Sequence, residues 1–134
     1  MICVLGGRGV NPLMLDDDTL DFLRAQAPGA GFVASVCTGA LVVGAAGLLR
    51  GKRATTHWAY RDLLIPFGAV PTQSRVVRDG SLMTGGGVTA GIDFGLALVA
   101  ELAGPERARP SSCSSNMLRS RRSTPASLRR RRRA

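Results

Sequence analysis

An all-apolar run that passes directly into a segment of small residues is the feature that most limits what this chain can fold into. The run FVASV, at 32–36, has the pattern of a parallel strand covered on both faces. The segment TGALVVGAAGLL, at 38–49, has the glycines and alanines that let a buried helix lie close to a sheet. We expect its C-cap at Gly51. The two segments together predict a strand and a helix of an α/β fold.

Strand and helix patterns alternate along residues 1–104, which predicts a mainly parallel sheet with helices on both faces. Other strands are expected at ICVL and RATTHW, and Asp79-Gly80 predicts a hairpin within SRVVRDGSLMTGG. Other helices are expected at DDDTLDFLRAQA, AYRDLLIPF and TAGIDFGLALVAELA. The chain begins inside a strand and shows about four strands. We therefore expect a flavodoxin-like three-layer α/β/α sandwich that lacks its first βαβ unit.

The net charge of +9 comes entirely from the end of the chain. Residues 1–104 hold eight basic and eight acidic side chains, whereas residues 105–134 hold ten arginines and one glutamate. Segment 110–134 has no apolar periodicity, so we expect a disordered basic low-complexity tail after a domain at 1–109. A solvated tail and a nucleic-acid-binding arm are two interpretations of it, and a third is given below.

Several classes of protein are disfavoured by the sequence. No apolar run reaches the roughly 18–20 residues that span a bilayer, and MICVLGGRG lacks the basic start of a signal peptide. The three cysteines have no metal-like or disulfide spacing, and the glycines at 85–87 lack the Lys-Ser/Thr of a phosphate loop. We expect a cytoplasmic protein with no metal, cofactor or membrane partner.

Cys37 stands at the junction between the predicted strand and the predicted helix. A nucleophile elbow needs a strand, a sharp turn and small neighbours, and SVCTGA supplies all three. The helix N-terminus would favour the thiolate, and the carboxyl end of a strand is where open α/β sheets place their sites. From these residues alone, a buried core thiol stays open as the alternative.

Two long blocks of the chain resemble the ThiJ/PfpI superfamily, also called class I glutamine amidotransferase-like. They are SVCTGALVVGAAGLLRGKRATTHWAYRDLL and RVVRDGSLMTGGGVTAGIDFGLALVAELAG, and the similarity extends over residues 2–109. Within the superfamily, the chain is most similar to isonitrile hydratases of the cyclohexyl-isocyanide hydratase type. Leu5 takes the place of the proline that usually precedes the paired glycines of the family.

The resemblance implies a role for each residue of the elbow. Cys37 would be the nucleophile, and Thr38 replaces the histidine of peptidase-like members, which disfavours a peptidase. The Thr38 hydroxyl would bond near the reacting group, and the N–H groups of Gly7 and Thr38 would stabilise negative charge. The implied reaction hydrates an isocyanide to an N-substituted formamide through a covalent intermediate, with an acid/base partner.

That acid/base partner is the open part of the predicted site. The family carries an acidic residue in the first βα unit, whereas the aspartates at 16–18 are expected to be a solvated helix start. His57 lies either at the pocket edge or, as we favour, in a structural position with its ring hydrogen-bonded. We expect Trp58 in the core or at an interface, and Cys3 buried in its strand.

Three other functions remain open from the sequence. One is the ligand-sensing domain of an AraC-type regulator, which shares ATTHW but carries a helix-turn-helix pair and often lacks the cysteine. Another is a cysteine-based stress or redox protein, which would form a stable sulfinate at Cys37. The third is an inactive fragment. The expected partners are a small isocyanide-like molecule and a second copy of the chain, because an exposed sheet edge favours dimerisation or poor solubility.

A change of reading frame is the interpretation that we favour for the basic tail. A codon choice exists for which one restored base after Arg109 makes the tail read AIQLQLEYAPEPPFDA. That segment is similar to the continuation in members of the family. On this interpretation the arginines were not selected to bind nucleic acid, and no specific nucleic-acid partner is expected.

Overall fold

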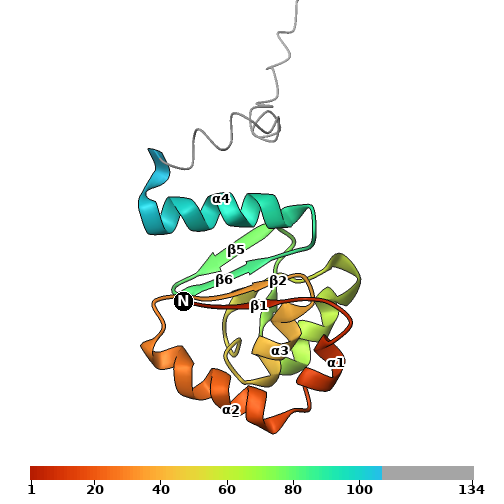
Figure 1. Ribbon diagram of the computed structural model, residues 1–134. Coiled ribbons are helices and arrows are strands. Elements are labelled where there is room, and N and C mark those ends of the chain that lie inside the picture. The colour runs from red at the N-terminus through yellow and green to blue at the C-terminus, as the bar shows by residue number, and fades with distance from the viewer. Residues whose placement is uncertain (107–134) are drawn as a thin grey trace, which may run out of the picture.

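The computed structural model describes residues 1–106, which form a four-stranded sheet between helices (Figure 1). The strand order is β1-β2-β6-β5, in which β1, β2 and β6 run parallel and β5 runs antiparallel to β6. Two short strands, β3 and β4, pair in a separate parallel sheet. In chain order the elements are β1 (Ile2–Leu5), α1 (Val10–Leu13), α2 (Asp17–Gln26), the 3-10 helix η1 (Ala27–Gly29), β2 (Val33–Val36), α3 (Gly39–Ala45), β3 (Arg53–Ala54), the 3-10 helix η2 (Trp58–Phe67), β4 (Val70–Pro71), β5 (Val76–Asp79), β6 (Leu82–Gly85) and α4 (Ala90–Ala103).

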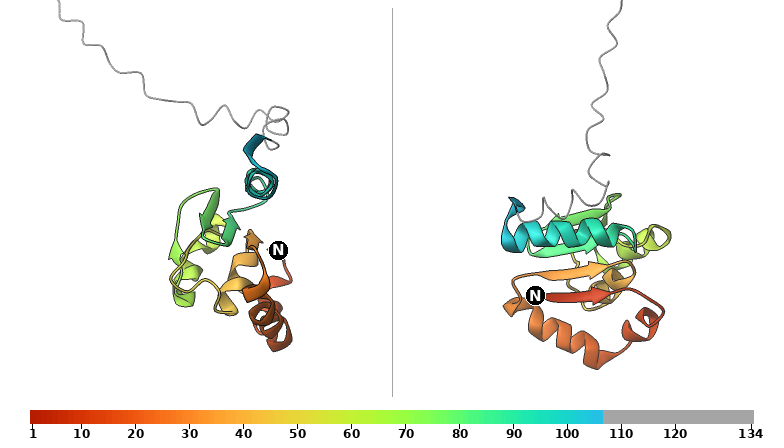
Figure 2. Two further views of the ribbon diagram at one scale, coloured as in Figure 1. Left: turned by 90° about the vertical axis from the view of Figure 1, so that its left-hand side faces the viewer. Right: turned by 45° about the horizontal axis from the view of Figure 1, so that its top comes forward.

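Helices cover both faces of the four-stranded sheet (Figure 2). On one face, α4 lies over β5 and β6, where Phe94 packs with Met83 and Ala34. On the other face, α3 lies against β1 and β2, and α1 and α2 pack against α3. This second layer holds the larger core, in which Val42 and Val43 of α3 are fully buried. The predicted α/β sandwich with a mainly parallel sheet is confirmed.

Small residues bring α3 against the sheet, as its composition predicts. A Cβ atom added at Gly39 would lie 2.2 Å from the carbonyl oxygen of Val4, so only glycine allows this approach. The helix ends at Ala45, and Gly47 then adopts a φ of 80° that turns the chain out of the helix. The prediction of a C-cap at Gly51 is therefore wrong, because an earlier glycine takes the left-handed turn.

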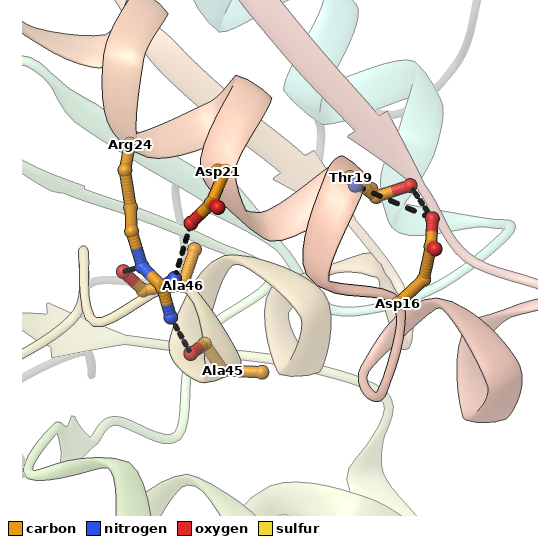
Figure 3. Close-up of polar contacts among 6 residues, drawn as sticks. All are labelled: Asp16, Thr19, Asp21, Arg24, Ala45 and Ala46. Carbon is orange, nitrogen blue, oxygen red and sulfur yellow. Dashed lines mark hydrogen bonds and ion pairs between the residues drawn. The ribbon is translucent and has the colours of Figure 1, made fainter.

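The helix α2 begins where its acidic residues indicate. Asp16 is the N-cap, and its carboxylate accepts hydrogen bonds from the N–H (3.3 Å) and the hydroxyl of Thr19 (Figure 3). Towards the other end, Arg24 pairs with Asp21 at 2.8 Å and donates to two carbonyls at the C-terminal end of α3. Those carbonyls have no partner within α3, so the guanidinium caps α3 and fixes α2 beside it.

Two elements differ from the prediction. The strand expected over RATTHW is two residues long and pairs with β4, because Thr55 and Thr56 turn to bond β6 and the end of β2. The helix expected over AYRDLLIPF is a 3-10 helix that keeps Pro66 inside it and ends at Gly68, where φ is 75°. The hairpin at Asp79-Gly80 is confirmed between β5 and β6, and α4 ends at Gly104 as expected.

The edge strand β1 is half-buried rather than buried. Its residues Ile2 and Val4 pack on the core below α3, whereas Cys3 and Leu5 point to the opposite face. There α4 packs mainly on β5 and β6, and Leu5 is 68% exposed. The expectation that Cys3 is buried is wrong, because Cys3 lies on the same face of this edge strand.

The basic tail lies outside the described residues. Its predicted range, 110–134, and Cys113 fall within 107–134, so the predicted disorder, the domain boundary after residue 109 and the frameshift stay predictions.

Candidate functional site

Cys37 occupies a strained turn between β2 and α3. Its φ of 58° places it in the left-handed region, and it is the one non-glycine residue there within residues 1–106. This conformation costs a side-chain-bearing residue roughly 1–2 kcal/mol. Strain of this kind persists only where neighbouring contacts hold it, and it concentrates at functional sites.

Hydrogen bonds hold the backbone of Cys37 on both sides. Its N–H donates to the carbonyl oxygen of Gly85 at 2.8 Å, which ties the turn to the end of β6. Its own carbonyl oxygen accepts from the Thr56 hydroxyl at 2.7 Å, and Thr56 is 1% exposed. The strained residue is thus anchored to two segments that are distant in the sequence.

The loop after β1 approaches the turn so closely that it requires glycine. A Cβ atom at Gly6 would lie 2.6 Å from the Thr38 nitrogen and 2.9 Å from the Cβ of Cys37. The next residue, Gly7, has a φ of 145° and donates its N–H to the Thr38 hydroxyl at 3.1 Å. This bond fixes the Thr38 oxygen as an acceptor, which leaves the hydroxyl proton available to a ligand.

A cavity of about 520 Å³ opens beside the elbow. Cys37, Thr38 and Gly7 line it, together with Arg8, Val10, Asn11, Leu41, His57 and Tyr60. The Nδ1 atom of His57 accepts a hydrogen bond from the Ala59 N–H at 3.3 Å, so a neutral ring carries its proton on Nε2. No carboxylate lines this cavity among residues 1–106.

The structure thus brings Cys37, Thr38 and Gly7 together. Each lies within two residues of the end of a parallel strand, and these strands end at one edge of the sheet. The aspartates at 16–18 lie elsewhere, at the exposed start of α2. The His57 ring is hydrogen-bonded, as the structural interpretation expects. Trp58 is 75% exposed, which excludes the core and leaves the expected place at an interface as a prediction.

Sequence reasoning missed two residues that build the site. Gly6 carried a signal, since paired glycines directly after a strand indicate a close backbone approach. Thr56 carried none, because its bond to Cys37 crosses 19 positions and follows no periodic pattern.

Within the described part of the chain, no three His, Cys, Asp or Glu side chains gather in a way that could hold a metal ion. None of its helices combines the length and the apolar character that crossing a membrane requires.

Comparison with known proteins finds relatives that agree with the resemblance seen in the sequence. The chain is 66% identical to an isonitrile hydratase of Pseudomonas putida over 109 residues, which are 81% of this chain and 48% of that protein. A solved ThiJ/PfpI family protein from Pseudomonas syringae superposes with a TM-score of 0.77 at 41% identity, covering 96% of this chain and 52% of that one. The HTH-type transcriptional regulator CdhR of Pseudomonas aeruginosa is 43% identical over 74 residues, 53% of this chain and 22% of that protein.

The chain therefore spans about half the length of the hydratase and of the solved ThiJ/PfpI protein. The regulator matches a shorter segment at lower identity, so the similarity to the hydratase carries more weight. The model of the DJ-1/PfpI family matches residues 1–101, in agreement with the resemblance in the sequence. The chain belongs to the DJ-1/PfpI family.

Proposed function

We propose that this chain takes part in the hydration of an isocyanide to an N-substituted formamide, with Cys37 as the nucleophile. One observation carries the proposal: the left-handed turn presents Cys37 and the Thr38 hydroxyl to the same cavity. The 66% identity to an isonitrile hydratase supports this reaction over others in the family.

In the first step, the Cys37 thiolate attacks the terminal carbon of the isocyanide. A carbon–sulfur bond forms, and the carbon takes up one proton, which gives a thioimidate bound to the enzyme. The carbon carries negative charge before it is protonated, so a hydrogen-bond donor beside it lowers the barrier. The Thr38 hydroxyl can serve as that donor, because its oxygen already accepts from Gly7 and its proton is free.

In the second step, water adds to the thioimidate carbon and the carbon–sulfur bond breaks. The water oxygen stays on the carbon as the carbonyl, one water proton goes to the nitrogen, the other is released and balances the proton taken up in the first step, and Cys37 leaves as thiolate. The product is the formamide, and the sum of the two steps is the addition of one water. No oxidant or cofactor enters this balance.

Gly7 acts in this proposal by positioning Thr38. Its N–H already donates to the Thr38 oxygen, so direct stabilisation of the substrate by Gly7 requires that bond to open. We assign to this chain the nucleophile and its hydrogen-bond donors, and no proton-transferring carboxylate, since none lines the cavity among residues 1–106. His57 keeps its structural role at the border of the cavity.

The test separates covalent attack from turnover. We expect incubation with cyclohexyl isocyanide to give a protein adduct at Cys37, seen by mass spectrometry of the intact chain and its peptides, and formamide in the supernatant. Cys37→Ala should lose both. Cys3→Ala is the matched control, because Cys3 lies outside the cavity, and it should keep both. Formamide production that survives Cys37→Ala would remove the nucleophile assignment.

We also propose that the protein acts in the cytoplasm as a homodimer. Cysteines without disulfide spacing fit a reducing compartment. The exposed Leu5 on the edge strand β1 supports association between copies, because free strand edges pair readily. Analytical ultracentrifugation that finds only monomer across the micromolar range contradicts the dimer.

A further inference from the structure

A second cavity, of about 680 Å³, adjoins the one that holds Cys37. It lies between η2, the segment that leads into β5, and the start of α4, and Cys37 does not line it. His57 lines both cavities, so the two are neighbours. The proposed reaction uses only the first, which leaves the second cavity without a role.

Two arginines bring positive charge to this second cavity, and only one of them is neutralised. Arg75 pairs with Asp93 through its Nε atom at 2.7 Å and also donates to the carbonyl oxygen of Thr89 at 3.2 Å. Arg61 forms no ion pair within residues 1–106. Its Nε atom is buried and has no hydrogen-bond acceptor there. Arg61 is half-buried and lines the cavity, so a negatively charged oxygen bound there would give its guanidinium the partner that residues 1–106 do not supply.

The rim of the cavity is apolar. Trp58 and Val88, which both line it, are 75% and 89% exposed. A single exposed apolar side chain is ordinary, but two at the mouth of a cavity that contains an unpaired cation match a molecule with both a hydrocarbon part and an anionic part.

We propose that this cavity binds a small organic acid, whose carboxylate pairs with Arg61 and whose hydrocarbon body packs against Trp58 and Val88. The guanidinium of arginine matches a carboxylate through two parallel N–H···O bonds. A single negative charge is the right complement, because Asp93 already balances Arg75. This binding does not depend on the reaction at Cys37.

The probe is cyclohexanecarboxylate, titrated into the full chain by isothermal calorimetry. Cyclohexanecarboxamide, which has the same shape without the charge, is the matched ligand. Arg61→Gln removes the proposed partner, and Arg50→Gln is the matched variant, because Arg50 is exposed and lines neither cavity. We expect the carboxylate to bind wild type and Arg50→Gln alike, and Arg61→Gln at least about tenfold more weakly.

Three results would overturn the proposal. The first is equal binding of the carboxamide and the carboxylate to the wild-type chain, a comparison that needs no variant to fold. The second is carboxylate binding that survives Arg61→Gln in a chain whose thermal melt matches the wild type. The third is absence of carboxylate binding to the wild-type chain at millimolar concentration.

Discussion

Replacing Thr56 with valine tests what holds Cys37 in its left-handed conformation. The Thr56 side chain is buried, and its hydroxyl donates a 2.7 Å hydrogen bond to the Cys37 carbonyl. Valine keeps the shape of threonine and removes the donor. The carbonyl then keeps only the longer contact, 3.5 Å, from the Ala40 N–H.

The size of the effect follows from two terms. Leaving a buried acceptor poorly paired costs about 1–3 kcal/mol. Relaxation of Cys37 out of the left-handed region returns part of its strain, which is about 1–2 kcal/mol in total. We therefore expect Thr56→Val to lower the free energy of unfolding by about 1–2 kcal/mol, measured by urea denaturation with far-ultraviolet circular dichroism.

Thr55→Val is the matched control for this experiment. Thr55 is equally buried, but its hydroxyl reaches only the Thr56 carbonyl at 3.5 Å, at the limit of a hydrogen bond. It should therefore cost less than about 1 kcal/mol. If Thr55→Val destabilises the chain as much as Thr56→Val, general loss of buried hydroxyls explains both, and the argument for Thr56 as the support of the turn fails.

Two further predictions concern packing and pH. Gly39→Ala should lower the free energy of unfolding by about 1–3 kcal/mol, because its Cβ would meet the Val4 carbonyl. Gly91→Ala in α4, where nothing lies within 4 Å of the added Cβ, should raise the free energy of unfolding by about 0.5–1 kcal/mol. If urea denaturation shows that both substitutions stabilise or both destabilise the chain, the packing argument is contradicted. Although Cys3 is exposed as a residue, partial desolvation raises the pKa of its thiol, so the folded chain keeps the proton that the unfolded chain loses first. Peptide mass spectrometry should show that alkylation of Cys3 sets in at a higher pH in buffer than in urea. The free energy of unfolding should fall as the pH rises from the thiol pKa of the unfolded chain to that of the folded chain. Identical pH profiles would refute the assignment.

The sequence predicted elements well where one residue pattern serves one element. The apolar run at 32–36 became β2, and Asp79-Gly80 became the turn between β5 and β6. The end of α3 was mispredicted because Gly47 and Gly51 both adopt positive φ, and composition does not say which of them ends the helix. The exposure of Cys3 was mispredicted because β1, an edge strand, has the same apolar composition as a central strand.

The candidate site was predictable where it follows strand ends. Gly7 and Cys37 each come just after a parallel strand, and neighbouring parallel strands end at one edge of the sheet. Thr56 lies two residues after β3, a two-residue strand of the other sheet. Only the tertiary fold brings its hydroxyl to the Cys37 carbonyl. The second cavity could not be predicted from the sequence for the same reason, because Arg61 and Arg75 line it from separate segments of the chain.

In the proposed reaction, attack by Cys37 and turnover depend on different groups. The turn is held by Gly85 at the end of β6, by Thr56 and by the close approach of Gly6, and all three lie within residues 1–106. These contacts hold the strained turn at Cys37 from within the described residues. Proton transfer in the proposed reaction needs an acid/base group. No carboxylate lines the cavity beside Cys37 among residues 1–106. We therefore expect the adduct at Cys37 to form faster than formamide is released, so adduct accumulates before product. Steady product formation without accumulated adduct would show that the cavity already contains a competent proton-transfer group.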